Sequence, residues 1–219
     1  MRNKISENIQ SIEERIARAA GRAGRAARDV KLIPVTKSVG EEEARILVGL
    51  GYTDLGENRI ETARPKIDAL GPGVRWHMIG HVQRRKAREV ARLFDRVDSV
   101  DRLQLAEALE KHCAEAGKTL DVLLQVNVSG EESKGGFTQA SIRDAIEVVR
   151  ALPHLRVQGL MTMAPIVDDP EEARPLFARL RELAKGLGLA ELSMGMTNDF
   201  EVAIEEGATE VRIGTAIFK

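Results

Sequence analysis

Cysteine is almost missing from this sequence, since only Cys113 occurs among 219 residues. One cysteine can form neither an internal disulfide nor a cluster of thiolate metal ligands, so both are excluded and a reducing compartment is indicated. Cys113 lies in a segment of helical periodicity, where we expect it to pack in the core.

Long apolar runs are missing too. Nowhere do the roughly 18 consecutive apolar residues of a membrane-spanning helix occur, and the charged amino-terminal segment has no apolar stretch typical of an export signal. We therefore expect a cytoplasmic protein without membrane contact.

Excess charge and aromatic residues are scarce as well. Lys+Arg number 33 against 34 Asp+Glu, and aromatic residues make up 3% of the chain, which leaves few side chains for base stacking. The basic run Arg84, Arg85 and Lys86 is expected to be a solvated helix face, and no nucleic-acid partner is expected.

What is present begins with an amphipathic segment. Ile5, Ile9, Ile12 and Ile16 recur at helical spacing, which predicts a helix within residues 1–27 that packs on a larger body.

After this segment, short apolar runs alternate with longer segments of helical periodicity, a pattern typical of a parallel sheet. Eight strands can close into a (β/α)₈ TIM barrel or form an open doubly wound sheet, and the chain length favours closure. No Pro-, Ser- or Gln-rich linker interrupts the pattern, so we expect one domain over residues 1–219. The expected strands are 30–36, 53–56, 74–80, 96–100, 120–127, 155–161, 191–195 and 209–214.

Lysine follows the first of these strands directly. In such barrels the active face is formed by the carboxyl ends of the strands, so Lys37 is expected at the mouth of the barrel. Desolvation there would lower the pKa of its amine and allow a Schiff base with a carbonyl ligand. The alternative is an ordinary surface lysine.

Glycine and hydroxyl residues follow the last two strands. Barrels often bind phosphate between these two loops, where a helix start offers free backbone N–H groups. The alternative is that the residues only cap turns. The candidate phosphate ligands are Ser193, Thr197, Gly214 and Thr215.

Further polar residues are expected at the mouth after the second and third strands, namely Glu57, Asn58, His77 and His81. His77 and His81 lie on a strand and a turn rather than on one helix, so we expect no metal site from this pair.

Six segments in order are similar to the family of pyridoxal phosphate homeostasis proteins, and the resemblance covers nearly the whole chain after the first helix. The segments are LIPVTKS (32–38), DLGENRIE (54–61), WHMIGHVQRRK (76–86), QVNVSGEESKGGF (125–137), GLMTMAP (159–165) and LSMGMTNDFEVAIEEGATEVRIGTAIF (192–218).

The resemblance implies the barrel of alanine racemase, fold type III among enzymes that use pyridoxal 5′-phosphate (PLP), with PLP bound covalently as an aldimine on Lys37. It also implies that Arg212 faces the pyridine nitrogen and that Asn58 and His77 lie near the ring. The implied phosphate ligands are Ser193, Met194, Gly195, Thr197, Gly214 and Thr215.

The sequence departs from the family pattern in three places. Thr197 and Gly135 stand where serine is usual, and the chain stops at Lys219 where a glycine and a short tail are usual.

By this resemblance we expect a carrier rather than an efficient enzyme, a monomer that buffers PLP and hands it to PLP-dependent apoenzymes in transient contacts. Racemases of this fold have a second domain, and Tyr52, the only tyrosine, is expected at the end opposite the mouth. The alternatives are a weak amino-acid racemase with Lys37 as its single base, and a barrel that binds another phosphorylated metabolite without covalent chemistry. We also hypothesise a secondary or transfer site at Lys134.

Overall fold

The computed structural model describes residues 1–131 and 134–219. Its eight strands are all parallel and lie in the order β1-β8-β7-β6-β5-β4-β3-β2. All eight expected strands are confirmed. Their bounds are β1 (Lys31–Pro34), β2 (Asp54–Glu57), β3 (Arg75–Met78), β4 (Arg96–Val100), β5 (Leu120–Gln125), β6 (Leu155–Met161), β7 (Glu191–Ser193) and β8 (Glu210–Ile213).

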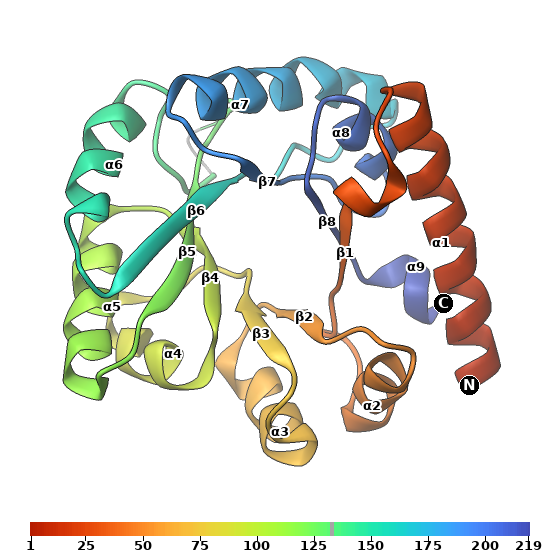
Figure 1. Ribbon diagram of the computed structural model, residues 1–219, viewed down its shortest axis with the longest axis horizontal. Coiled ribbons are helices and arrows are strands. Elements are labelled where there is room, and N and C mark those ends of the chain that lie inside the picture. Colours follow the sequence, from red (N-terminus) through yellow and green to blue (C-terminus); the bar gives the residue numbers. More distant parts are fainter. Residues whose placement is uncertain (132–133) are drawn as a thin grey trace.

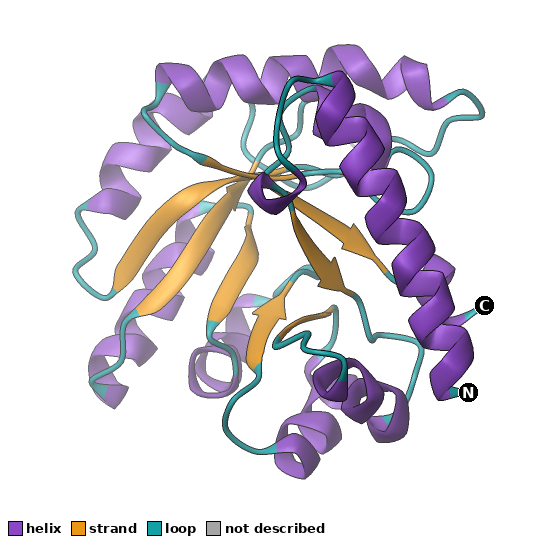
Figure 2. Ribbon diagram, turned by 45° about the vertical axis from the view of Figure 1, so that its right-hand side comes forward, coloured by secondary structure: helices purple, strands orange, loops and turns teal. Residues whose placement is uncertain are grey.

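The sheet closes on itself where β1 meets β2. Val35 forms an isolated parallel bridge with Gly56, and the Thr36 backbone N–H donates to the Gly56 oxygen at 2.9 Å. Figure 1 shows the resulting ring of strands with the helices outside it, and Figure 2 shows the same arrangement turned by 45°. The expectation of a (β/α)₈ barrel is therefore confirmed over that of an open sheet.

The helices lie outside the ring, and the longer ones each bury one apolar stripe. In α6, for example, Ile142, Ala145, Ile146 and Val149 are buried at the spacing of one helix face. The helices are α1 (Arg2–Arg22), α2 (Glu41–Gly49), α3 (Ile60–Leu70), α4 (Ala87–Leu93), α5 (Leu103–Ala116), α6 (Ser141–Arg150), α7 (Arg174–Gly186), α8 (Phe200–Glu205) and α9 (Thr215–Phe218), with short 3₁₀ turns η1 (Ala27–Asp29), η2 (Arg84–Lys86) and η3 (Pro170–Ala173).

Helix α1 packs along α8 and α9 at one side of the barrel, where both chain termini lie (Figure 1). It ends at Arg22 rather than at 27, and the chain then enters the short turn η1. Its four isoleucines are buried as expected, and Arg15 both pairs with Glu201 at 2.6 Å and lies over the ring of Phe200.

Two apolar regions hold the barrel together. The larger one lies between strands and helices and includes Cys113, whose thiol pKa is raised to about 11 by burial. A smaller set, with Ile33, Leu123 and Met161, is buried apart from it.

In the described parts of the chain, the helices are all too short or too polar to span a bilayer.

Candidate functional site

Lys37 follows β1 at the carboxyl end of the barrel, directly after the buried Thr36. Its side chain is exposed, and among the described residues it has no hydrogen bond or ion pair. The desolvation expected from the sequence is therefore wrong for this structure, while the expected place at the mouth is correct.

The loop after β8 lies against the end of β1. A Cβ atom added to Gly214 would lie 3.0 Å from the backbone oxygen of Val35, which is tighter than ordinary contacts. Glycine at 214 thus allows this loop to approach the strand that leads into Lys37. Thr215 is exposed and begins α9.

The loop after β7 has a conformation that favours glycine. Gly195 has φ +94°, and a Cβ atom there would lie 2.7 Å from the Cβ of Ala203 and 2.9 Å from the Cα of Phe200. The loop is held by Asp199, whose carboxylate accepts from the Met196 backbone N–H at 2.6 Å. Because α8 starts here, its first backbone N–H groups face the same loop.

These two loops together offer unpaired hydrogen-bond donors. They are adjacent, since the Arg212 backbone N–H donates to the Gly195 oxygen at 3.0 Å. Over residues 1–131 and 134–219, no backbone acceptor bonds to the N–H groups of Gly195, Thr197, Gly214 or Thr215. Free backbone N–H groups on two adjacent loops are a candidate anion site of the kind that binds phosphate.

Arg212 lies beneath this anion site and is held from two sides. Its Nη1 donates to the Ser193 hydroxyl at 2.6 Å and its Nη2 to the Thr162 backbone oxygen at 2.8 Å, so its Nε is left without an acceptor in the described parts of the chain. Burial lowers the pKa of this guanidinium, and the charges of Asp98 and Asp199 oppose that shift. Thr162 was not among the residues expected at this site.

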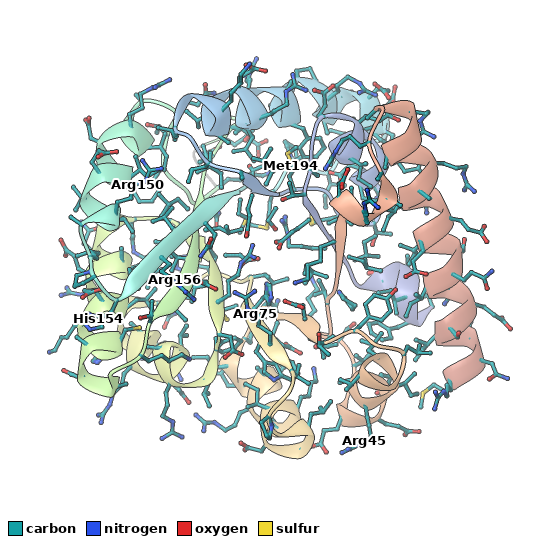
Figure 3. The ribbon with its side chains drawn as sticks, viewed as in Figure 1. Arg45, Arg75, Arg150, His154, Arg156 and Met194 are labelled. Atoms are coloured by element: carbon teal, nitrogen blue, oxygen red, sulfur yellow. The ribbon has the colours of Figure 1, made fainter. Side chains whose placement is uncertain are left out.

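Two of the expected phosphate ligands have other partners. The Ser193 hydroxyl is buried and accepts the hydrogen bond from Arg212. The Met194 side chain is buried at the end of β7 (Figure 3), and its backbone N–H already donates to the Glu210 oxygen at 3.1 Å. Met194 therefore offers no free backbone donor, whereas the Ser193 hydroxyl only accepts from Arg212 and its own O–H has no acceptor among the described residues.

Asn58 and His77 lie in different surroundings. Asn58 is half-buried at the mouth, where it lines a cavity of about 430 Å³ together with Gly80 and His81. His77 is fully buried, and its Nε2 lies 2.9 Å from Asp54, at the beginning of β2. The expectation that His77 lies at the mouth is wrong, because its side chain points into the barrel and toward the amino ends of the strands.

A cluster of charged groups fills the barrel interior below Arg212. Arg96 donates to Asp98 at 2.7 Å and to both carboxylate oxygens of Glu210, at 2.9 and 2.6 Å. His77, Asp98 and Glu210 each offer an atom within 4.8 Å of the others, as metal ligands would. However, Arg96 already supplies the positive charge there, so the cluster does not need a metal ion to balance its carboxylates.

The opposite end of the barrel holds the only tyrosine. Tyr52 precedes β2, donates to Glu13 of α1, and lines a cavity of about 460 Å³ between α1 and the starts of β1 and β2. Burial, followed by this hydrogen bond, raises the pKa of Tyr52. Its expected position away from the mouth is confirmed.

Lys134 lies in the loop after β5, next to residues 132–133, which are outside the described residues. Its side chain is half-buried and its Nζ lies 3.9 Å from Glu131, in a weak ion pair. Within residues 1–131 and 134–219, no other side chain pairs with the Lys134 amine, so the hypothesis of a secondary site there stays a prediction.

Known proteins with similar sequences agree with this geometry. The alanine racemase N-terminal domain family matches residues 8–219. A pyridoxal phosphate homeostasis protein of Aquifex aeolicus is 41% identical over 97% of this chain and 96% of its own length. Another, from Pseudomonas aeruginosa, is 43% identical over 98% of this chain and 94% of its own. This chain belongs to the family of pyridoxal phosphate homeostasis proteins.

Solved structures of similar proteins have the same barrel. PipY of Synechococcus elongatus, whose structure contains PLP, is 34% identical with a TM-score of 0.83 over 93% of this chain and 100% of that chain. Alanine racemase of Clostridium difficile is 13% identical with a TM-score of 0.79, and the match covers 99% of this chain but 56% of that one. The second likeness shows the fold alone.

Proposed function

We propose that this protein binds PLP at the carboxyl end of its barrel, holds the aldehyde as a Schiff base on Lys37, and thereby buffers and delivers the cofactor. The observation that carries the proposal is the close approach of Gly214 to Val35, which brings the loop after β8, a candidate phosphate-binding loop, beside the segment that leads from β1 to Lys37. Membership of the family and the PLP in the PipY structure support the same assignment.

The residues at this end suit the chemical groups of PLP. The free N–H groups of Gly195, Thr197, Gly214 and Thr215 match the phosphate oxygens in number and in charge preference. The remaining Nε donor of Arg212 suits the pyridine nitrogen, while Asn58 would lie beside the ring.

A guanidinium next to the pyridine nitrogen favours storage over turnover. Arginine keeps its proton in proteins, so it leaves the ring nitrogen unprotonated, and an unprotonated ring is a weaker electron sink for carbanion chemistry. Bound PLP supplies a reversible carbonyl reaction with an amine. Tyr52 lies at the other end of the barrel, so a second proton carrier of this type is missing from the mouth.

We further propose that the protein acts as a cytoplasmic monomer that meets PLP-dependent apoenzymes transiently. The exposed position of Lys37 supports transfer, because a partner can reach the amine without opening the fold.

The test is a visible absorption spectrum of the purified protein with added PLP, followed by borohydride reduction and peptide mapping. Wild type is expected to show an imine band and a reduced label on Lys37, and Lys37→Ala is expected to lose both. Lys134→Ala serves as the matched control and is expected to keep the band. Label on Lys37 alone would remove the hypothesis of a secondary site at Lys134.

Absence of an imine band in wild type would contradict the proposal. Binding of phosphorylated metabolites in general, without colour, would then be the better function for this barrel. Turnover of a D- or L-amino acid that disappears in Lys37→Ala would instead identify a weak enzyme.

A further inference from the structure

The peptide bond that precedes Lys37 lies where β1 and β2 close the barrel. β1 and β2 share one isolated bridge, between Val35 and Gly56, and the next residue, Thr36, donates its backbone N–H to the Gly56 oxygen. Beyond this point the seam is closed by side chains. The Thr36 hydroxyl donates to the Glu57 carboxylate at 2.6 Å, at the end of β2.

A lysine from α3 completes this contact. The ammonium group of Lys66 donates to the Thr36 backbone oxygen and to the same Glu57 carboxylate, each at 2.5 Å. The other oxygen of Glu57 accepts from the Thr62 hydroxyl at 2.9 Å. Lys66 is 3% exposed and Glu57 is 0% exposed, so the ion pair is fully removed from water.

Stability alone gives a poor account of such a pair. Removing two charges from water costs several kcal/mol for each ion, roughly, and buried pairs can often be replaced by apolar residues without loss of stability. The pair does have one specific effect, because the backbone oxygen that Lys66 binds belongs to the planar peptide unit joining Thr36 to Lys37. Holding that oxygen fixes the direction in which the Lys37 backbone leaves the strand.

We infer that Lys66 and Glu57 are positioning residues for Lys37, a role that rests on the function proposed above. The Lys37 side chain is exposed and lacks hydrogen bonds to the described residues, so its reach is set by its backbone. The pair orients that backbone so that the amine meets a PLP aldehyde whose phosphate is bound by the loops after β7 and β8.

The reaction that this orientation serves needs no further reactant. The neutral Lys37 amine attacks the aldehyde carbon and forms a C–N bond. The aldehyde oxygen then leaves with two protons as water, and a C=N bond remains. Orientation of the amine affects the rate of this step strongly, since a misplacement of about 1 Å can reduce a rate on the order of 100-fold.

The test separates imine formation from phosphate binding. Stopped-flow absorbance after mixing with PLP measures the rate of imine formation. Phosphate and ring binding are measured by calorimetry with pyridoxamine 5′-phosphate, which has no aldehyde and forms no imine. The main variant is the double substitution Glu57→Gln with Lys66→Met, because a single substitution leaves a buried unpaired charge and would threaten folding.

The double variant is expected to form the imine on the order of 100-fold more slowly while its affinity for pyridoxamine 5′-phosphate stays unchanged. The matched control is Lys118→Met. Lys118 also donates to a backbone oxygen at 2.5 Å, that of Phe94, but it lies before β5 at the other end of the barrel. This control is expected to change neither measurement.

Three results would overturn the inference. An unchanged rate of imine formation in the folded double variant would remove the positioning role and leave the proposed function intact. If the double variant lost both its rate of imine formation and its affinity for pyridoxamine 5′-phosphate, the pair would support the whole site and not Lys37 in particular. If wild type itself formed no imine, the proposed function would fail, and the positioning role would fail with it.

Discussion

The two ends of the barrel differ in whether their polar groups have partners. Toward the amino ends of the strands and in the interior, charged groups pair with each other, although His77 Nδ1, Asp98 Oδ2 and Glu191 Oε2 are buried without a hydrogen-bond partner among the described residues. Arg96 binds Asp98 and Glu210, and Asp121 accepts from Arg156 at 2.8 Å and also pairs with Arg75 (Figure 3). At the carboxyl end, Lys37 and four backbone N–H groups lack partners among the described residues.

This difference separates groups that hold the fold from groups that await a ligand. A buried polar group without a partner costs roughly 1–3 kcal/mol, so the paired interior is what a stable fold requires. Unpaired donors at the mouth are in part open to water, since Thr215 is exposed and Thr197 and Gly214 are half-buried, whereas Gly195 is buried. They lie in the adjacent loops after β7 and β8, and this arrangement serves an anion better than it serves the fold.

The comparison is tested most strongly by removing a charge from the interior. Arg96→Met would leave Asp98 and Glu210 buried without their shared cation, and we expect a loss of about 3–5 kcal/mol in the free energy of unfolding. Lys37→Met, at the mouth, is expected to change it by less than about 0.5 kcal/mol. Urea unfolding of wild type and both variants measures these changes in the free energy of unfolding. Equal losses would show that the two ends do not differ as described.

A glycine in the mouth tests the anion site without removing a charge. Gly195→Ala forces a side chain into φ +94° and against Phe200, so we expect a loss of about 1–3 kcal/mol in stability. It should also shift the nearby N–H groups and weaken PLP binding about tenfold, which corresponds to about 1.4 kcal/mol.

Gly207→Ala is the matched control for this substitution. Gly207 has φ +98°, but a Cβ atom there meets only the flexible side chain of Arg181, and the residue lies before β8 at the other end of the barrel. We expect a similar backbone strain with unchanged PLP affinity. Equal loss of affinity in both variants would contradict the assignment of Gly195 to the anion site.

The sequence was sufficient for the fold because each strand is a short apolar run and each helix carries an apolar stripe. The place of a residue after a strand also predicted the end of the barrel at which Lys37 and Gly214 lie, while Gly195 was predicted from the family resemblance. The place of a residue after a strand does not predict how deeply its side chain is buried or which groups it bonds to. Those depend on the neighbouring strands, which is why Ser193 and Met194 turned out to be already bonded.

His77 shows the same limit more clearly. It lies in the last part of β3, but its ring points inward and reaches Asp54 on the neighbouring strand. A clearer signal was present in β4, where Arg96 and Asp98 alternate with apolar Val97. Charges at alternate positions of a strand whose other face is covered by helices predict a paired interior.

The paired interior also predicts a pH dependence. Burial alone would lower the pKa of His77, but the carboxylates of Asp54 and Asp98 outweigh it and raise that pKa above its ordinary value. Because the pKa is higher in the folded state, its contribution to stability is fully present below the unfolded-state pKa and is lost as the pH rises through the folded-state pKa. Urea unfolding at a series of pH values measures the free energy of unfolding and shows whether it falls as the pH rises.

His77→Asn is the control for this pH dependence. It should reduce the slope of the free energy of unfolding against pH, between the unfolded-state and folded-state pKa of His77. The effect is expected to be smaller than that of Arg96→Met, since a neutral imidazole can still donate to Asp54. A slope that persists in His77→Asn would assign the dependence to another group.

The smallest effect is expected at the rim of the amino end, where matched charges meet water. Arg156 donates to Asp121 at 2.8 Å, but its side chain is 62% exposed. Solvent screens such a pair, and Asp121 keeps Arg75 and Gln158 as partners, so Arg156→Ala should cost less than about 1 kcal/mol and less still at high salt. PLP affinity should not change. A cost near that of Arg96→Met would mean that burial is not what distinguishes the structural charges, because the same kind of pairing would then stabilise the fold equally in water and in the interior.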